Sequence, residues 1–247
     1  MTSSPVIIGV HGWLLSRKVW TPLERRWGAL LHPSAETQEN HGWRLWCPDL
    51  PGFGERRRTG SLRPTLAAYG RWLAESALEK AGGSPFVLMG HSLGASIVLH
   101  AASQLKRSGA GRFRGVVCIA AGGGIYQPRA FRTLRRGGRW AVNLRPPLPL
   151  KLGPFQAEQR AALGLLTNST CRGAVQQIPR LVADLAVESL WISGSDDRVM
   201  EPRYVRHLAG YNPRHSFISI DKCGHLPMQT HPQTLKTTLE TWLGKQA

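Results

Sequence analysis

The stretch Pro85-Phe-Val-Leu-Met-Gly-His-Ser-Leu-Gly-Ala-Ser-Ile-Val-Leu-His-Ala-Ala102 decides the fold. It opens with a short apolar run typical of a buried strand and closes with the apolar spacing of a helix. Between them, Gly90-His91-Ser92-Leu93-Gly94 fits the pattern Gly-x-Ser-x-Gly, in which a strand turns sharply into a helix. Such a turn lifts the central hydroxyl above the sheet, and glycines avoid clashes on either side. We therefore predict a nucleophile at Ser92; the alternative is a merely structural Gly-Ser turn.

Apolar runs and helical patterns alternate on both sides of this stretch. Strands are predicted at residues 6–10, 44–49, 86–90, 115–120, 190–193 and 216–220. Helices are predicted at residues 20–31, 64–81, 92–106, 202–210 and 232–243. Strands that are apolar throughout and alternate with helices indicate a mostly parallel sheet covered on both faces. The expected fold class is α/β, with about six strands.

One segment interrupts the alternation. Residues 122–187 contain no convincing strand but carry a Gly-rich entry, a basic helical candidate at 129–140, a Pro-rich turn at 146–149 and a helical pattern at 156–185. We expect two parts: an α/β core formed by residues 1–121 and 188–247, and a helical cap formed by residues 122–187. Insertions at the carboxyl ends of strands carry the ligand site in α/β sheets, so a lid over a pocket is the expected role.

Two motifs lie just past later predicted strands, Leu190-Trp-Ile-Ser-Gly-Ser-Asp-Asp-Arg-Val199 and Asp221-Lys-Cys-Gly-His-Leu-Pro227. Elbow, acid and histidine in this order resemble the α/β-hydrolase fold superfamily over almost the whole chain. The resemblance implies that Asp197 is the acid and His225 the general base. Adjacent Asp196 remains an alternative acid, and either aspartate could instead cap the helix that starts near Pro202.

These residue types suit nucleophilic catalysis. A serine hydroxyl is a poor nucleophile until a neutral imidazole takes its proton, and a buried carboxylate fixes the tautomer of that imidazole. Val10-His11-Gly12-Trp13 resembles the His-Gly-x motif of the superfamily, which supplies backbone donors to the oxyanion of the tetrahedral intermediate. The resemblance assigns this role to the amides of Trp13 and Leu93; the alternative is a turn with a packed tryptophan.

Two more motifs narrow the resemblance. Together with His-Gly-Trp, the pair Val19-Trp20 and the run Asp49-Leu-Pro-Gly-Phe-Gly54 are most similar to small capped carboxylesterases of the pimeloyl-acyl-carrier-protein methyl ester esterase type. This implies a serine hydrolase that cleaves a carboxylic ester or a thioester through an acyl-enzyme, with a methyl ester on a carrier-bound acyl chain as the candidate substrate. The alternatives are carbon–carbon bond hydrolysis or elimination on the same fold, and a non-catalytic binding protein.

The charge of the chain is strongly unbalanced. Its 247 residues include 32 Lys and Arg against 15 Asp and Glu, a formal net charge of +17, and no acidic residue lies between Glu79 and Glu158. Five arginines gather in the predicted lid: Arg129, Arg132, Arg135, Arg136 and Arg139. Phe131, Leu134 and Trp140 could form an opposing anchor, although Gly137-Gly138 is expected to weaken or end the helix. An acidic carrier protein or anionic acyl substrate, a membrane surface and a merely solvated face all remain open.

Composition excludes several other classes. A 42% hydrophobic content argues against disorder, and no run approaches the roughly 20 apolar residues of a membrane span. The four cysteines are widely scattered, so neither a metal site nor a disulfide framework is expected. We expect no cofactor, no nucleic-acid partner and, because no signal peptide is recognisable, a cytoplasmic location; the sequence leaves the oligomeric state open.

Overall fold

The computed structural model describes residues 4–28, 42–144 and 157–246, and its framework is one six-stranded sheet. The spatial order of the strands is β2 (Arg44–Trp46), β1 (Val6–Val10), β3 (Phe86–His91), β4 (Phe113–Ile119), β5 (Glu188–Gly194) and β6 (His215–Ile220). Every neighbouring pair is parallel. The predicted α/β class is therefore confirmed, and all six predicted strands are present.

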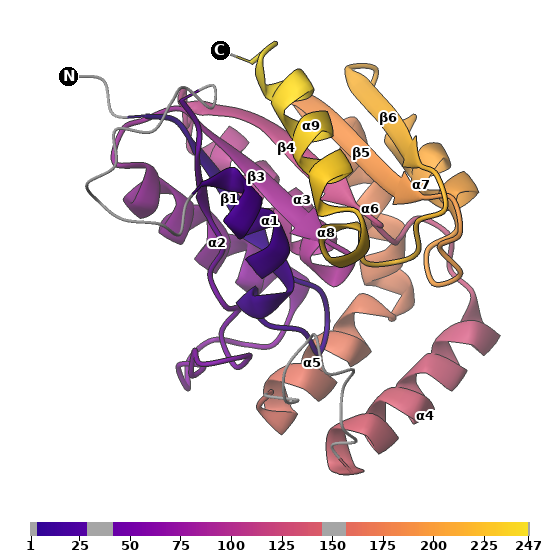
Figure 1. Cartoon of the computed structure of the whole chain (residues 1–247). Coiled ribbons are helices and arrows are strands. Elements are labelled where there is room, and N and C mark those ends of the chain that lie inside the picture. The colour runs from indigo at the N-terminus through magenta and orange to yellow at the C-terminus, as the bar shows by residue number, and fades with distance from the viewer. Residues whose placement is uncertain (1–3, 29–41, 145–156, 247) are drawn as a thin grey trace.

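Helices cover both faces of the sheet (Figure 1). Their bounds are α1 (Thr21–Trp27), α2 (Leu66–Ala81), α3 (Leu93–Arg107), α4 (Pro128–Leu144), α5 (Gln159–Ser169), α6 (Arg172–Ala183), α7 (Pro202–Ala209), α8 (Pro227–Thr230) and α9 (Pro232–Leu243). A short 3₁₀ helix, η1 (Arg17–Trp20), precedes α1. Helices α1, α8 and α9 lie in front of the sheet in Figure 1, and α2 and α3 lie behind it.

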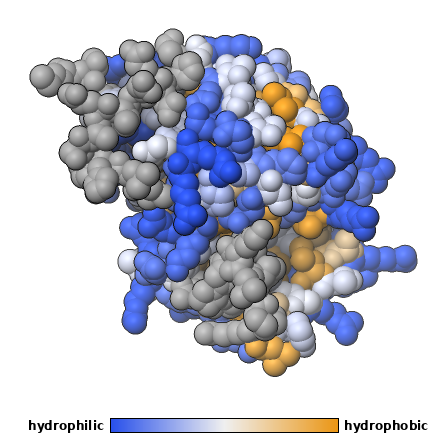
Figure 2. All heavy atoms as spheres, in the orientation of Figure 1, coloured by the Kyte–Doolittle hydropathy of each residue, from blue (hydrophilic) through white to orange (hydrophobic). Residues whose placement is uncertain are grey.

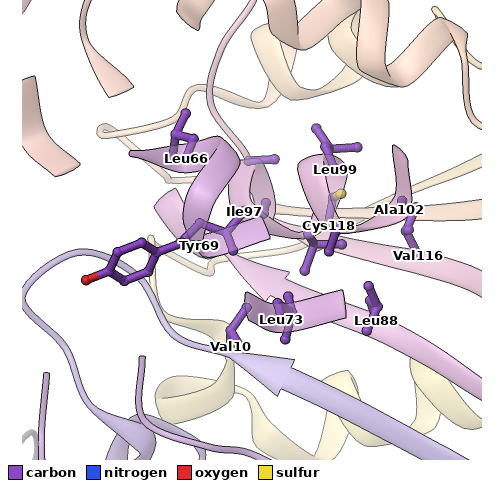
Figure 3. Close-up of a cluster of buried hydrophobic side chains, with 14 of the residues drawn as sticks. Val10, Leu66, Tyr69, Leu73, Leu88, Ile97, Leu99, Ala102, Val116 and Cys118 are labelled. Atoms are coloured by element: carbon purple, nitrogen blue, oxygen red, sulfur yellow. The ribbon is translucent and has the colours of Figure 1, made fainter. Parts of the chain in front are cut away.

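Alternate residues of the strands supply two separate cores. Val10 and Leu88 pack with residues of α2 and α3, such as Leu73, behind the sheet, and Figure 3 shows these side chains converging. Ile7 and Met89, their neighbours in sequence, belong to the other core with residues of α1 and α9. Because both faces are covered, the central strands are apolar throughout, as the sequence indicated.

The largest differences from the predicted elements occur at their ends. Helix α1 ends at Trp27 rather than at residue 31, because Gly28 adopts a left-handed conformation with φ of 80° and stops the helix. Strand β2, at one edge of the sheet, pairs with β1 only over Arg44–Trp46, whereas the strand was predicted to residue 49. The remainder of the helix predicted to residue 31, the Pro-rich turn at 146–149 and the basic residues Arg145 and Lys151 fall outside the described residues.

Helices α4, α5 and α6 occupy the interval between β4 and β5, where the sequence indicated an insertion. Buried residues of α5 and α6 join the core behind the sheet, whereas α4 contributes only Val142 to it. Gly137-Gly138 does not end this helix, because α4 runs through both residues; that the pair weakens the helix stays a prediction. A side-chain carbon at Gly138 would come within 2.4 Å of Leu166 and 2.6 Å of Trp13, so glycine lets α4 approach them closely. Trp140 is 59% exposed and does not anchor the helix.

None of the described helices combines the length and the apolar composition that crossing a membrane requires.

Candidate active site

Ser92 sits at the junction of β3 and α3 in a strained backbone conformation. Its φ of 53° and ψ of −117° lie outside the regions that residues with a side chain normally adopt. A hydrogen bond to the neighbouring strand stabilises this conformation, since the Ser92 amide donates to the carbonyl of Ile119 at 2.9 Å. Added side-chain carbons at Gly90 and Gly94 would lie 2.5 and 2.6 Å from backbone atoms, which explains both glycines of the motif.

Asp197 and His225 meet at the carboxyl ends of β5 and β6. Asp197 follows β5 by three residues, and His225 follows β6 by five. The Nδ1 of His225 donates to Oδ2 of Asp197 at 2.8 Å, and Asp197 is 3% exposed. This bond fixes the imidazole with a proton on Nδ1, which leaves its Nε2 free to accept a proton.

The second carboxylate oxygen of Asp197 is also fully engaged. Oδ1 accepts hydrogen bonds from the amides of Val199 at 2.8 Å and Met200 at 2.9 Å. Burial alone would raise the pKa of Asp197, but the bonds from His225, Met200 and Val199 outweigh it and lower the pKa. A carboxylate held ionised in this way can stabilise a positive charge on His225.

The structure places Asp196 away from His225. Asp196 is exposed, and its Oδ1 accepts a hydrogen bond from the Ser195 hydroxyl at 3.0 Å. Neither aspartate caps α7, whose N-cap residue is Glu201. Of the two carboxylates that the sequence left open, only Asp197 contacts the histidine.

The loop after β1 brings Trp13 beside the turn between β3 and α3. Trp13 and Leu93 both line the cavity that contains Ser92. Leu93 is the first residue of α3, so its amide hydrogen has no acceptor within the helix. The indole Nε1 of Trp13 donates to the carbonyl of Ala162 in α5 at 2.9 Å, and Leu14 next to it adopts a φ of 60°. The loop is therefore tied to α5 and held in an uncommon turn.

A buried network supports this loop from below. His11 donates from Nδ1 to the carbonyl of Gly12 at 2.8 Å and accepts at Nε2 from the amide of Leu50 at 3.1 Å. The bond accepted at Nε2 requires the neutral imidazole, and burial lowers the pKa of His11 to about 4. Asp49 accepts from the amides of Arg17 at 2.6 Å and Glu55 at 2.9 Å, and so joins the loops after β1 and β2.

The cavity above Ser92 is mainly apolar. It has a volume of about 360 Å³, and its lining includes Ser92, His225, Trp13 and Leu93. Helix α4 contributes Phe131 and Leu134, and the remaining apolar lining residues from neighbouring elements are Leu15, Leu166, Val175, Ile178, Val199, Met200 and Leu226. Figure 2 shows hydrophobic residues gathered in a hollow above α4, on a surface that is otherwise largely hydrophilic. The structure describes no direct hydrogen bond between Ser92 and His225, but both side chains face this cavity.

Comparison with known proteins shows the family. A model described as the alpha/beta hydrolase family matches residues 7–236. The chain belongs to the alpha/beta hydrolase family. This alpha/beta hydrolase is similar to the pimeloyl-acyl-carrier-protein methyl ester esterase of Xanthomonas oryzae pv. oryzae (strain MAFF 311018), with 28% identity over 97% of the chain and 95% of the relative.

Solved structures share the fold of this hydrolase. A thermophilic esterase from Thermogutta terrifontis superposes with a TM-score of 0.76 at 21% identity, covering 99% of this chain and 90% of the esterase. A bromoperoxidase from Bacillus anthracis gives a TM-score of 0.77 at 16% identity, covering 98% and 92% of the two chains. Because proteins with such different titles superpose equally well, the fold alone does not decide the reaction.

The five arginines predicted as a partner surface lie on α4 of the hydrolase, outside the cavity lining. Four of them are exposed, and Arg135 is half-buried. Within the described ranges, no carboxylate forms an ion pair with any of the five. Phe131 and Leu134 of the same helix line the cavity, although Leu134 is 45% exposed.

Sequence reasoning missed several residues of the site in this hydrolase. His91, at the variable position of the elbow motif, is buried and contacts His225. Ser169, Thr170 and Ile178, from α5, α6 and the turn between them, line the cavity without belonging to any motif. Only the apolar periodicity of residues 156–185 hinted at their placement. In the described part of the chain, no cluster of three His, Cys, Asp or Glu side chains suitable for a metal is present.

Proposed function

We propose that this alpha/beta hydrolase is a serine hydrolase that cleaves a carboxylic ester through an acyl-enzyme. The observation that carries the proposal is the bond from His225 to the buried Asp197, with Ser92 in a strained elbow facing the same cavity. The similarity to a protein named as a methyl ester esterase supports an ester as the substrate. In this proposal Ser92 is the nucleophile, His225 the general base and acid, and Asp197 the residue that orients and stabilises His225.

The reaction follows from these roles in two halves. The Ser92 hydroxyl attacks the ester carbonyl while His225 takes its proton, and the amides of Trp13 and Leu93 hold the resulting oxyanion. His225 then returns the proton to the leaving alcohol, which leaves an acyl group on Ser92. Water attacks this acyl group with His225 again as base, and the acid leaves as Ser92 regains its proton.

Removing the nucleophile tests the proposal. We expect Ser92→Ala to lower kcat for a small neutral methyl ester by at least about 10⁴-fold, because no covalent intermediate can form. A fluorophosphonate probe should label the wild type, and peptide mass spectrometry should place the label on Ser92 and not on Ser96 or Ser169 of the same cavity. Turnover by Ser92→Ala at the wild-type rate, or no labelling of the wild type, contradicts the proposal. Trapping the acyl-enzyme would also exclude a purely non-covalent elimination.

We further propose that α4, α5 and α6 form a lid and that the basic face of α4 receives an acidic carrier bearing the acyl chain. The five arginines lack carboxylate partners in the described structure, so their charge is available to an anionic surface. Phe131 and Leu134 of α4 line the apolar cavity, which suits an acyl chain entering beside this helix. The similarity to the Xanthomonas esterase, whose name contains an acyl-carrier protein, supports this partner.

Charge removal separates a carrier surface from a solvated face. We expect Arg132→Gln, Arg135→Gln and Arg136→Gln together to raise KM for an ester on an acidic carrier about 10-fold or more, and to leave turnover of a small neutral ester unchanged. A matched control replaces three basic residues away from α4 by Gln: Arg112 and Arg114, at the amino end of β4, and Lys245, which shares a surface pocket with Arg114. If both triple variants change the carrier substrate equally, α4 is only a solvated face.

A further inference from the structure

His91 is buried between the nucleophile elbow and the histidine loop. It is 1% exposed, and its ring centroid lies 4.8 Å from that of His225. Its Nε2 is 2.8 Å from the backbone carbonyl oxygen of His225. A carbonyl oxygen can only accept, so Nε2 carries the proton and donates it to this contact. The residue beside the nucleophile therefore contacts the main chain of the residue proposed as general base.

The surroundings of the other ring nitrogen, Nδ1, determine whether the His91 side chain is charged. Nδ1 is buried and has no hydrogen-bond partner in the described structure. A side-chain carbon at Gly12 would come within 2.9 Å of this nitrogen, so the loop after β1 closes over it. An N–H buried without an acceptor is costly, and His91 is therefore the neutral tautomer with its proton on Nε2. Burial, together with the charge of nearby His225, lowers the pKa of His91 to about 3.

The backbone around His225 needs such an anchor. The preceding residues are well held, because Asp196 donates its amide to the carbonyl of Cys223 at 2.9 Å and Lys222 donates to the Ser195 hydroxyl at 2.9 Å. These bonds stop at Cys223, and His225 itself lies in irregular backbone before α8. No described residue other than His91 donates to its carbonyl.

We propose that His91 is a positioning residue that fixes the main chain of His225, as Asp197 fixes its side chain. His91 contacts the backbone carbonyl of His225 and Asp197 contacts its Nδ1. Together the two contacts keep Nε2 of His225 in place relative to Ser92. A neutral anchor is required, because a cation 4.8 Å from His225 would oppose the positive charge that His225 gains during catalysis. The inference rests on the function proposed above, in which His225 is the general base.

Three variants test the role of His91. His91→Phe keeps a ring but removes the donor, and we expect kcat for a small neutral ester to fall roughly 10- to 100-fold with KM changed less than about 2-fold. His91→Gln restores an N–H donor and should recover most of this loss. His100→Phe is the matched control, because His100, in α3, is buried like His91 and has one unpartnered ring nitrogen, Nε2, but does not line the cavity. Its kcat should equal that of the wild type.

The outcomes distinguish the inference from the function on which it rests. No labelling of the wild type by the fluorophosphonate probe overturns the proposed function, whereas labelling with an unchanged His91→Phe overturns only the role of His91. Equal losses in His91→Phe and His100→Phe, or no recovery in His91→Gln, also overturn it. Should His91→Phe not fold, nitrogen NMR of the wild type decides: a charged His91, or one protonated on Nδ1, contradicts the contact.

Discussion

At the scale of single residues, the site depends on which of two adjacent aspartates is buried. Asp197 uses both carboxylate oxygens for three hydrogen bonds, while Asp196 is exposed and bonded to Ser195. Adjacent residues just past a strand face different directions, so one reaches His225 and the other reaches solvent. The difference arises from backbone direction rather than from chemistry, since the two side chains are identical.

Asp197→Asn should therefore strongly lower kcat without unfolding the protein. The amide oxygen of the introduced asparagine can still accept from Val199 and Met200, which turns its NH₂ group towards Nδ1 of His225. Nδ1 must then accept, and the proton moves to Nε2, where it blocks proton transfer from Ser92. We expect kcat to fall roughly 10³- to 10⁴-fold with little change in KM, measured on a small neutral ester.

Asp196→Asn is the matched control for this prediction. It removes the same charge one residue earlier at an exposed position, and kcat should stay within about 2-fold of the wild type. Equal losses in both variants would mean that general loss of negative charge, and not the bond to His225, causes the effect.

The sequence predicts the three proposed catalytic residues from motifs in chain order. Ser92 has a local signature, and Asp197 and His225 follow later strands in the order that the superfamily shows. It could not identify the contact of His91 with the His225 carbonyl, because that contact joins residues 134 positions apart through a backbone atom. Main-chain acceptors leave no pattern in side-chain identities.

At the scale of elements, α4 depends on two neighbouring glycines with opposite surroundings. Gly137 faces open space, whereas Gly138 packs against Trp13 and Leu166. We expect Gly137→Ala to stabilise α4 by up to about 1 kcal/mol, because alanine has the higher helix propensity. Slower hydrogen exchange of the α4 amides would show this.

Gly138→Ala adds the same methyl group as Gly137→Ala, but we expect it to lower catalytic activity. Its new carbon would overlap the ring of Trp13, whose amide is the proposed oxyanion donor, and displace the helix or the ring. We expect kcat to fall about 10-fold while Gly137→Ala retains the wild-type value. Equal kcat in the two variants would show that the contact of α4 with Trp13 does not support the oxyanion site.

Element types were predictable because both periodicities are strong, but element ends depended on local backbone conformation. The sequence predicts a helix that continues past Gly28, and it predicts that Gly137-Gly138 weakens or ends its helix. Helix α1 instead ends before Gly28, and α4 does not end at the two glycines. Gly28 takes a left-handed conformation that ends its helix, while Gly138 remains helical because it provides room for Trp13. Whether a glycine ends a helix or admits a neighbour depends on tertiary contacts that composition does not contain.

At the scale of the whole molecule, the layered α/β fold followed from alternating apolar strands and helices, but the set of residues that line the cavity did not. Its walls combine residues from the elbow, the loop after β1, and helices α4 to α6, which meet only when the sheet has assembled. Asp49 and His11 illustrate the same point, since their motifs were visible but their joint support of the Trp13 loop was not.

Three buried histidines make the free energy of unfolding depend on pH. Burial lowers the pKa of His11 to about 4, of His91 to about 3 and of His100 to about 4. The unfolded chain binds a proton at each site below about pH 6.5, whereas the folded chain binds it only below these lower values. The contribution of these histidines to the free energy of unfolding is therefore fully present above pH 6.5, and it falls as the pH decreases towards 4. Each histidine removes up to about 1.4 kcal/mol per pH unit from the free energy of unfolding within this window.

Replacing one of these histidines isolates its contribution. His100→Gln keeps a neutral polar side chain of similar size outside the site, and it should reduce the slope of unfolding free energy against pH by about 1.4 kcal/mol per unit between pH 5 and 6. Urea unfolding at several pH values measures the slope for the wild type and for the variant. Repulsion within a chain of net charge +17 also grows in acid, but it acts on both proteins alike. Equal slopes would mean that His100 is protonated in the folded state.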